Sequence, residues 1–349
     1  MAPALLTGDV QFNEITGAST LAEVMSAVDY QVQAGQISHM RPLATGFSPL
    51  DDVLNGGLRP GDMLVVGGPS GVGKTIFAMQ MARNAVVQDP TAQVMYICYE
   101  HDRAHLMLRL LCMESAAMGR DDNALTLRKL SNLMLDSNGS GASGLVSQLS
   151  SHPRHGPVIQ SISRYADRFQ LVKASGAMTT LDQIRLWARR LVALGPQTLM
   201  IVDYLQKVPV DVTPSLQEIE VTTYLAQGLK ELAMSAGTRL LVIAAADRTG
   251  LQSKRLHLHD MRGSSAIQYE ADIGLVLNNK YNIVSREHIV YNPTLAEAMR
   301  NWVVMSVEKN RSGRNGIDME FQLSAANFHF DPRGDYVRDR LIDDRITLQ

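Results

Sequence analysis

One eight-residue segment constrains the fold of this chain more than any other. Residues 68–75 read Gly-Pro-Ser-Gly-Val-Gly-Lys-Thr, which fits the pattern G-x-x-x-x-G-K-[ST]. An apolar run at 63–67 precedes the segment, and a stretch of helical character at 76–87 follows it. This order of strand, loop and helix is typical of a phosphate-binding P-loop. A dinucleotide-binding fingerprint is disfavoured, because Ile76 stands where that motif needs a third Gly or Ala.

Each part of the loop has a physical task. Glycines at 68, 71 and 73 allow the backbone to wrap a phosphate with its N–H groups, and the following helix adds its dipole. Lys74 would neutralise β- and γ-phosphate oxygens, and Thr75 would offer a hydroxyl to Mg²⁺. We therefore expect ATP and Mg²⁺ as cofactors, in contact with Gly68, Pro69, Ser70, Gly71, Val72, Gly73, Lys74, Thr75 and Ile76.

Two carboxylates follow apolar runs elsewhere in the chain. Asp203 comes directly after residues 199–202, at the edge where open parallel sheets bind ligands, and we predict that it is the Walker B acid that shares Mg²⁺ with Thr75. Glu100 follows residues 94–99 and is the candidate base that polarises the attacking water. Asp102 competes for the role of base, and Asp203 could instead only cap its strand.

Short apolar runs alternate with helical segments from about Thr45 onward. The runs lie at 63–67, 94–99, 199–202 and 240–245. Such alternation favours an α/β fold with a mostly parallel sheet that is covered on both faces.

The N-terminal segment contains one isolated amphipathic helix. Residues 1–18 are polar and predict a loose lead-in, whereas Thr20 can cap a helix that runs to about Gln33. Its apolar residues recur at helical spacing, so the stripe must pack either on its own domain or on a neighbouring subunit; they are Leu21, Val24, Met25, Val28 and Val32.

Two other segments have compositions of their own. Residues 136–161 are rich in Ser, Gly, Pro and His, which predicts a mobile loop. The residues from 333 to 349 are charged, and we expect a solvated tail.

Composition limits the class of protein. Of the 349 residues, 45 % are hydrophobic and 19 % charged, which excludes wholesale disorder. Apolar runs such as 240–246 are too short for a membrane span, the first residues carry acids, and two cysteines cannot build a disulfide framework, so we expect a soluble cytoplasmic protein. The net charge of −2 gives no basic platform, so any nucleic-acid contact must come from a local loop.

Several segments, in the same order along the chain, resemble the RecA-like motor domain, which is the C-terminal domain, of the DnaB-family replicative hexameric helicases. They are Ala44–Asp51, Gly57–Gly61, the P-loop, Tyr99–Glu100, Val202–Gln206, Asp260–Arg262 with Ala271–Asp272, and Lys309–Gly313. The resemblance implies a RecA-like P-loop NTPase domain over 43–332, a lead-in and linker-type helix over 1–42, and a tail over 333–349.

The resemblance also implies an assembly and its site residues. It implies a homo-oligomer, usually a ring of six, with ATP between neighbours, where Lys309 and Arg311 reach the γ-phosphate of the adjacent subunit. It places Gln206 at the nucleotide site. Lys254, Arg255 and Arg262 would face single-stranded DNA in the central channel. The alternatives are a basic surface turn for 309–314 and a solvated loop for 248–262; a metal site at His257 and His259 is not expected, because suitably spaced cysteine or acid ligands are lacking nearby.

Two departures from the family affect the expected function. The sequence has no room for the family's helical N-terminal domain, so recruitment of a primase is not expected, although other replication or recombination proteins stay open as partners. The family's polar Ser-Gln sensor is replaced by Ala-Ala-Ala-Asp-Arg at 244–248, so Asp247 or Arg248 would have to sense the γ-phosphate. The leading hypothesis is a DNA-stimulated ATPase of helicase type; the alternatives are an ATP-switched scaffold or loader that does not unwind DNA, and a catalytically silent relative.

Overall fold

A ten-stranded mixed sheet forms the centre of the protein. The computed structural model describes residues 18–37, 40–119, 123–136, 144–210, 218–247, 250, 253–284, 297–339 and 341–342. The strands follow the order β10-β8-β7-β6-β1-β5-β4-β2-β3, and β9 pairs with β8. Their bounds are β1 Met63–Gly67, β2 Ala92–Cys98, β3 Phe169–Lys173, β4 Gln197–Asp203, β5 Arg239–Ile243, β6 Ile273–Asn279, β7 Trp302–Asn310, β8 Ile317–Ser324, β9 His329–Phe330 and β10 Asp335–Tyr336.

The six strands from β6 to β3 are parallel, and the strands beyond β6 are antiparallel. The four apolar runs of the sequence all form strands of this parallel part, namely β1, β2, β4 and β5. The predicted α/β class and its mostly parallel sheet are therefore confirmed. Because β1 lies between β5 and β6, the loop that follows it opens at the middle of the sheet edge.

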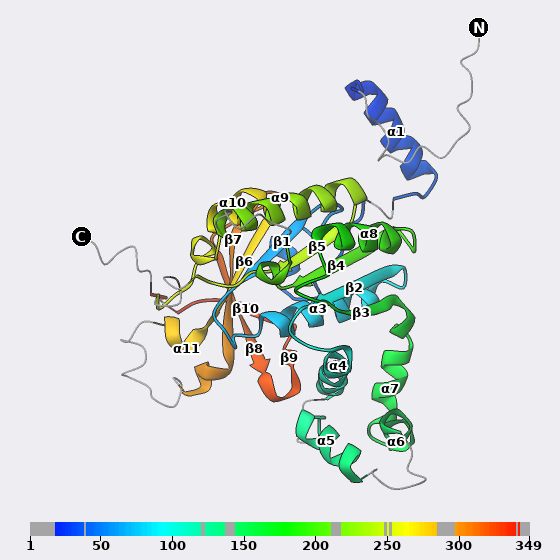
Figure 1. Ribbon diagram of the computed structural model, residues 1–349, viewed down its shortest axis with the longest axis vertical. Coiled ribbons are helices and arrows are strands. Elements are labelled where there is room, and N and C mark those ends of the chain that lie inside the picture. Colours follow the sequence, from blue (N-terminus) through cyan, green and yellow to red (C-terminus); the bar gives the residue numbers. More distant parts are fainter. Residues whose placement is uncertain are drawn as a thin grey trace.

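Helices cover both faces of the sheet (Figure 1). In β1, Leu64 and Val66 join the core on the side of α3, whereas Met63 and Val65 join the core on the side of α9. This alternation is the two-residue period of a strand that is buried on both faces. One face carries α3 (Lys74–Gln88) and α4 (Arg103–Met118), and the other carries α8 (Leu181–Val192), α9 (Glu218–Ala236) and α10 (Ser264–Glu270).

The segment expected to be a mobile loop is helical over the part that the structure describes. The prediction for 136–161 was wrong there, because α6 (Leu145–Ser151) and α7 (Gly156–Ser163) pack with α4 and α5 (Leu127–Asp136). Leu149 and Val158 belong to a small separate core with Leu111 of α4. A few apolar residues at helical spacing thus outweigh the Ser- and Gly-rich composition. Residues 137–143 lie outside the described part.

The N-terminal helix α1 (Leu21–Gln33) begins as the sequence predicts. Thr20 and Glu23 form a capping box, in which the backbone N–H of Thr20 donates to the Glu23 carboxylate at 2.7 Å. The apolar stripe, however, is not covered by the body of the protein: Leu21, Met25 and Val32 are 76, 60 and 55 % exposed. Figure 1 shows α1 standing apart from the sheet and its helices. The lead-in at 1–17 lies outside the described residues.

The charged C-terminal segment is only partly the solvated tail that its composition predicts. Within it, β10 pairs with β8 and extends the sheet. Asp339 accepts an ion pair from Lys280 at 2.6 Å, and Lys280 belongs to the short helix α11 (Lys280–Ile283). Residues 335–339 are therefore attached to the sheet and to α11, and residues 343–349 lie outside the described part.

Candidate nucleotide site

The P-loop lies at the carboxyl end of β1, between that strand and α3. Three of its glycines, at 68, 71 and 73, adopt positive φ angles of 144°, 77° and 105°. A Cβ atom on Gly68 would lie 2.5 Å from the carbonyl oxygen of Leu277, so this position also lacks space for a side chain. The loop conformation therefore requires glycine, as a backbone that presents its N–H groups to a phosphate does.

Lys74 closes the loop on itself. Its Nζ donates hydrogen bonds to the carbonyl oxygens of Gly68 at 2.7 Å and Pro69 at 2.9 Å. Burial lowers the pKa of Lys74, whereas the carboxylates of Asp203 and Glu100 raise it. The ammonium group is thus stored at the mouth of the loop, where phosphate oxygens could replace the two carbonyl acceptors.

Asp203 ends β4 beside the P-loop and is almost fully buried. Its Oδ2 accepts hydrogen bonds from Thr75 Oγ1 at 3.0 Å and from the Tyr96 hydroxyl at 2.8 Å. Burial raises the pKa of Asp203, and these two hydrogen bonds lower it in part. Hydroxyl and carboxylate oxygens are the ligands that Mg²⁺ prefers, so the pair Thr75 and Asp203 fits that ion.

A cavity of about 520 Å³ opens over these groups. Glu100 lines it, together with Ser70, Gly71, Ile76 and the residues named above. Asp102, the competing candidate for the base, is not among the residues that line it; it caps α4, where its carboxylate accepts from the N–H of His105 at 2.8 Å. This geometry favours Glu100 as the base.

The cavity also contains residues that the sequence patterns did not single out. Arg109, from α4, places its guanidinium 5.0 Å from the centre of the Phe328 ring, and both line the cavity with His101. Phe328 lies more than 200 positions from the other two in the sequence, and α4 contains no motif that marks them. They could be found only once the chain was folded.

Not every residue predicted for the nucleotide lies on the cavity wall. Val72 is buried in the core, and Pro69 contributes its carbonyl to Lys74. Gln206 lies behind the wall: its Oε1 accepts from the N–H of Ala245 at 3.1 Å, and its Nε2 donates to the carbonyl of Arg262 at 3.3 Å. In this geometry Gln206 connects the end of β4 to two other loops.

The altered sensor segment contributes methyl groups to the cavity. Ala245 and Ala246 line it, where a polar side chain would be able to contact a γ-phosphate. Asp247 accepts a hydrogen bond from the N–H of Gly250, within its own loop. Arg248, the other candidate replacement, lies outside the described residues.

The three basic residues predicted to face nucleic acid lie in different surroundings. Lys254 and Arg262 are exposed. The Arg255 guanidinium, however, donates to Asp318 at 2.7 Å and to Ser306 at 3.2 Å, and its side chain is only 11 % exposed. Because Arg255 is engaged inside the chain, the predicted nucleic-acid contact rests on Lys254 and Arg262.

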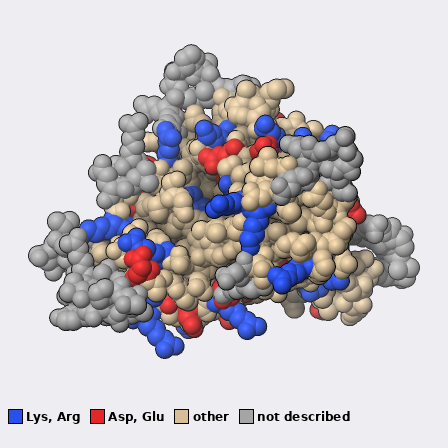
Figure 2. All heavy atoms as spheres, turned by 90° about the horizontal axis from the view of Figure 1, so that it is seen from below, with Lys and Arg blue, Asp and Glu red and all other residues tan. Residues whose placement is uncertain are grey.

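The surroundings of this loop are not uniformly basic. His257 Nδ1 lies 2.7 Å from a carboxylate oxygen of Glu308, which ties the loop to β7. In the part of the chain that the structure describes, three or more His, Cys, Asp or Glu side chains do not gather anywhere in a way that could hold a metal ion. Figure 2 shows basic and acidic side chains interspersed on one face of the molecule.

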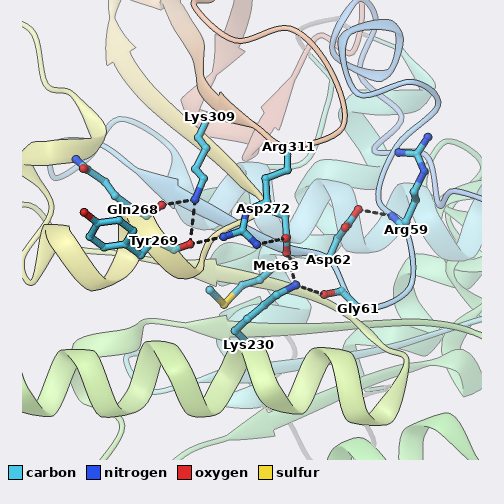
Figure 3. A network of polar contacts seen from close by, with 10 residues as sticks. All are labelled: Arg59, Gly61, Asp62, Met63, Lys230, Gln268, Tyr269, Asp272, Lys309 and Arg311. Atoms are coloured by element: carbon cyan, nitrogen blue, oxygen red, sulfur yellow. Dashed lines mark hydrogen bonds and ion pairs between the residues drawn. The ribbon is translucent and has the colours of Figure 1, made fainter. Parts of the chain in front are cut away.

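Lys309 and Arg311 lie at the opposite edge of the sheet from the P-loop. Arg311 donates to Asp272 at 3.1 Å, and Asp272 in turn accepts from the N–H of Met63, the first residue of β1 (Figure 3). The P-loop follows the last residue of β1, so the length of this strand, about 13 Å at about 3.3 Å per residue, separates the two sites. The pair therefore cannot serve the P-loop of its own chain.

The strand order and the loop at the carboxyl end of β1 define a P-loop protein of the RecA-like fold. Two solved structures agree with this fold. One, an isolated ATPase domain, has a TM-score of 0.69 at 17 % identity and covers 90 % of this chain and 99 % of that one. The other, "The Structure Of A DnaB-Like Replicative Helicase And Its Interactions With Primase", has a TM-score of 0.65 at 17 % identity, over 90 % of this chain and 67 % of that one.

The sequence comparisons define the family. The family model of the DnaB-like helicase C terminal domain matches residues 42–330, so the chain belongs to this family, as its motifs predict. Replicative DNA helicase DnaB of Treponema pallidum is 28 % identical over 289 residues, and that of Mycoplasma genitalium is 27 % identical over 292 residues. Each match covers 82 % of this chain but 55 and 56 % of the relative, so the chain spans about half the length of these relatives. Among the described helices, none combines the length and apolar character of a membrane span.

Proposed function

We propose that this protein hydrolyses ATP at interfaces between identical subunits and uses the hydrolysis to move along, or to hold, single-stranded DNA. One observation supports this most directly: a single chain carries the P-loop at one edge of its sheet and the Lys309–Arg311 pair at the other. Each chain therefore holds two halves of different sites, and a closed ring, of six subunits in our proposal, joins every P-loop to a neighbour's pair.

In the proposed reaction, each group performs a step that its position allows. Lys74 exchanges its two loop carbonyls for phosphate oxygens of ATP, and Glu100 takes a proton from the water that attacks the γ-phosphate. Thr75 and Asp203 hold Mg²⁺, which would neutralise phosphate charge. Lys309 and Arg311 of the adjacent subunit stabilise the charge that develops on the transferred phosphoryl group.

The contact with single-stranded DNA is proposed for the exposed Lys254 and Arg262. Basic side chains repeated around a ring would form a positive channel that binds phosphates without reading sequence, and the affinity would fall as salt is raised. The relatives from Treponema pallidum and Mycoplasma genitalium are replicative DNA helicases, which favours this motor over a scaffold that only changes its assembly state.

The experiment measures ATP turnover with and without single-stranded DNA, together with unwinding of a forked duplex. We expect DNA to stimulate turnover, Lys74→Ala to abolish it, and Arg311→Ala to lower kcat by about 10³-fold or more, the usual worth of such a cation. Arg314→Ala is the matched control, because Arg314 is exposed in the same turn.

Equal loss in Arg311→Ala and Arg314→Ala, or normal turnover in both, would contradict the trans arrangement. Turnover that does not respond to DNA, without ATP-dependent retention of DNA, would contradict the motor. Turnover with DNA retention but without unwinding would support a clamp and remove the helicase.

A further inference from the structure

We propose that Asp272 is the positioning residue of the Lys309–Arg311 pair, and that it fixes the arginine in place before a neighbour's nucleotide arrives. Arg311 is tied to this residue twice: its backbone N–H donates to the Asp272 carbonyl at 2.9 Å, and its guanidinium donates to Oδ1 at 3.1 Å. This inference rests on the function proposed above, because it concerns the same trans site.

Asp272 is itself anchored from two further sides. Its Oδ2 accepts from the N–H of Met63 at 2.8 Å and from Nζ of Lys230, a residue of α9, at 2.6 Å. Its own N–H donates to the Met63 carbonyl at 3.0 Å. Asp272 is only 7 % exposed, and its carboxylate cannot turn away without losing these partners. Arg311 is therefore held against the amino end of β1, in the middle of the sheet.

The last turn of α10 completes the seat (Figure 3). The carbonyl oxygen of Tyr269 accepts from both Arg311 and Lys309, and the carbonyl of Gln268 accepts from Lys309 as well. The carbonyls at the end of a helix carry partial negative charge, which favours two adjacent cations. One carboxylate and two carbonyls thus hold the pair together against its own repulsion.

The exposure of Arg311 shows why this seat positions the residue and does not bury it. Its side chain is 50 % exposed, although one edge of the guanidinium is bound to Asp272 and Tyr269. A guanidinium has five N–H donors, so the opposite edge can meet a phosphate of the next subunit. Orienting a charged group beforehand removes an entropic cost from the reaction, and a displacement of about 1 Å can cost about 10²-fold in rate.

The test is Asp272→Asn, which keeps the size of the side chain and an acceptor for the Met63 N–H but removes the charge. We expect kcat to fall about 10- to 100-fold. The KM for ATP should stay near the wild-type value, because the P-loop lies at the other edge of the sheet. The control is Lys230→Met, which removes the anchor from α9 but leaves the contact between Asp272 and Arg311; it should keep most of the turnover.

Mixed rings separate positioning from a folding defect. Lys74→Ala subunits cannot turn over ATP but have an intact pair, so in rings made with Asp272→Asn subunits they supply a correct Arg311 to an intact P-loop. We expect the mixture to exceed the summed turnover of its two parents. The double variant Asp272→Asn with Arg311→Ala should be no slower than Arg311→Ala alone.

The outcomes distinguish this inference from the proposed function. If Arg311→Ala is rescued in mixed rings but Asp272→Asn is not, or if Asp272→Asn has wild-type turnover, the positioning role is overturned and the trans site stands. If Lys230→Met loses as much kcat as Asp272→Asn, the role is attachment of α9, and the positioning role is again overturned. If Arg311→Ala itself keeps wild-type turnover, the trans site falls and the inference falls with it.

Discussion

Replacement of Tyr96 by Phe tests the electrostatics of the nucleotide site most sharply. The Tyr96 hydroxyl donates to Asp203 at 2.8 Å, and both residues are buried. Around the carboxylate, burial and Glu100 raise the pKa of Asp203, whereas Tyr96, Thr75 and Lys74 lower it. A hydrogen bond to a charged group contributes about 1.5–3 kcal/mol, which here favours the ionised carboxyl about 10- to 150-fold.

The expected result is a change in pH dependence. Only the ionised carboxylate serves Mg²⁺, so the Mg²⁺-dependent part of nucleotide affinity falls as the pH falls through the pKa of Asp203. Tyr96→Phe raises that pKa further, because a bond that favours the charged form is lost, and the fall in affinity then begins at higher pH. The assay titrates a fluorescent ATP analogue with and without Mg²⁺ at a series of pH values.

Tyr99→Phe is the matched control, since the Tyr99 hydroxyl donates to the carbonyl of Thr179 at 2.7 Å and not to Asp203. The two variants remove the same atom from neighbouring positions at the end of one strand. Coincident pH profiles for Tyr96→Phe, Tyr99→Phe and the wild type would refute the reasoning, because Asp203 would then not respond to its hydrogen-bond partner.

Three further predictions follow from contacts elsewhere in the chain. Glu114→Ala should cost about 3–5 kcal/mol of unfolding free energy in a denaturant titration, because Glu114 is fully buried and pairs with Arg83 at 2.7 Å; a loss below about 1 kcal/mol, the range of exposed pairs, would contradict this. The hydrogen bond to Glu308 raises the pKa of His257, so the stability that this pair adds at low pH is lost as the pH rises through that pKa; Tm should show this dependence in the wild type and lose it in Glu308→Gln. Gln206→Ala should bind ATP normally but respond less to single-stranded DNA in a turnover assay, and an unchanged response would exclude the connection through Gln206.

The sequence was sufficient to predict those parts of the site that are local. Strand, loop and helix are contiguous around the P-loop, so residues 63–87 carry their own geometry. Asp203 and Glu100 follow apolar runs, and the carboxyl ends of parallel strands meet at one edge. The roles of these residues in catalysis stay predictions that the experiments above address.

The parts that could not be predicted depend on partners far away in the sequence. Arg255 looked like a free cation, but its partner Asp318 lies 63 positions further on. Asp272 contacts Met63 across 209 positions. In 144–161 the helices are stabilised by a small core with α4, which a count of Ser and Gly does not reveal. In each case burial against a distant element, and not local composition, determined the outcome.

The short helix α10 connects these distant parts into one mechanical unit. Arg262, just before its amino end, is held by Gln206 and by Ala245, which line or support the chain's own nucleotide site. The carbonyl of Tyr269, near its carboxyl end, holds the pair that reaches the neighbour's site. A helix of this length, about 10 Å, moves as a rigid body. A shift at the predicted DNA loop therefore has to displace the trans pair as well, which is the coupling that a ring-shaped motor requires.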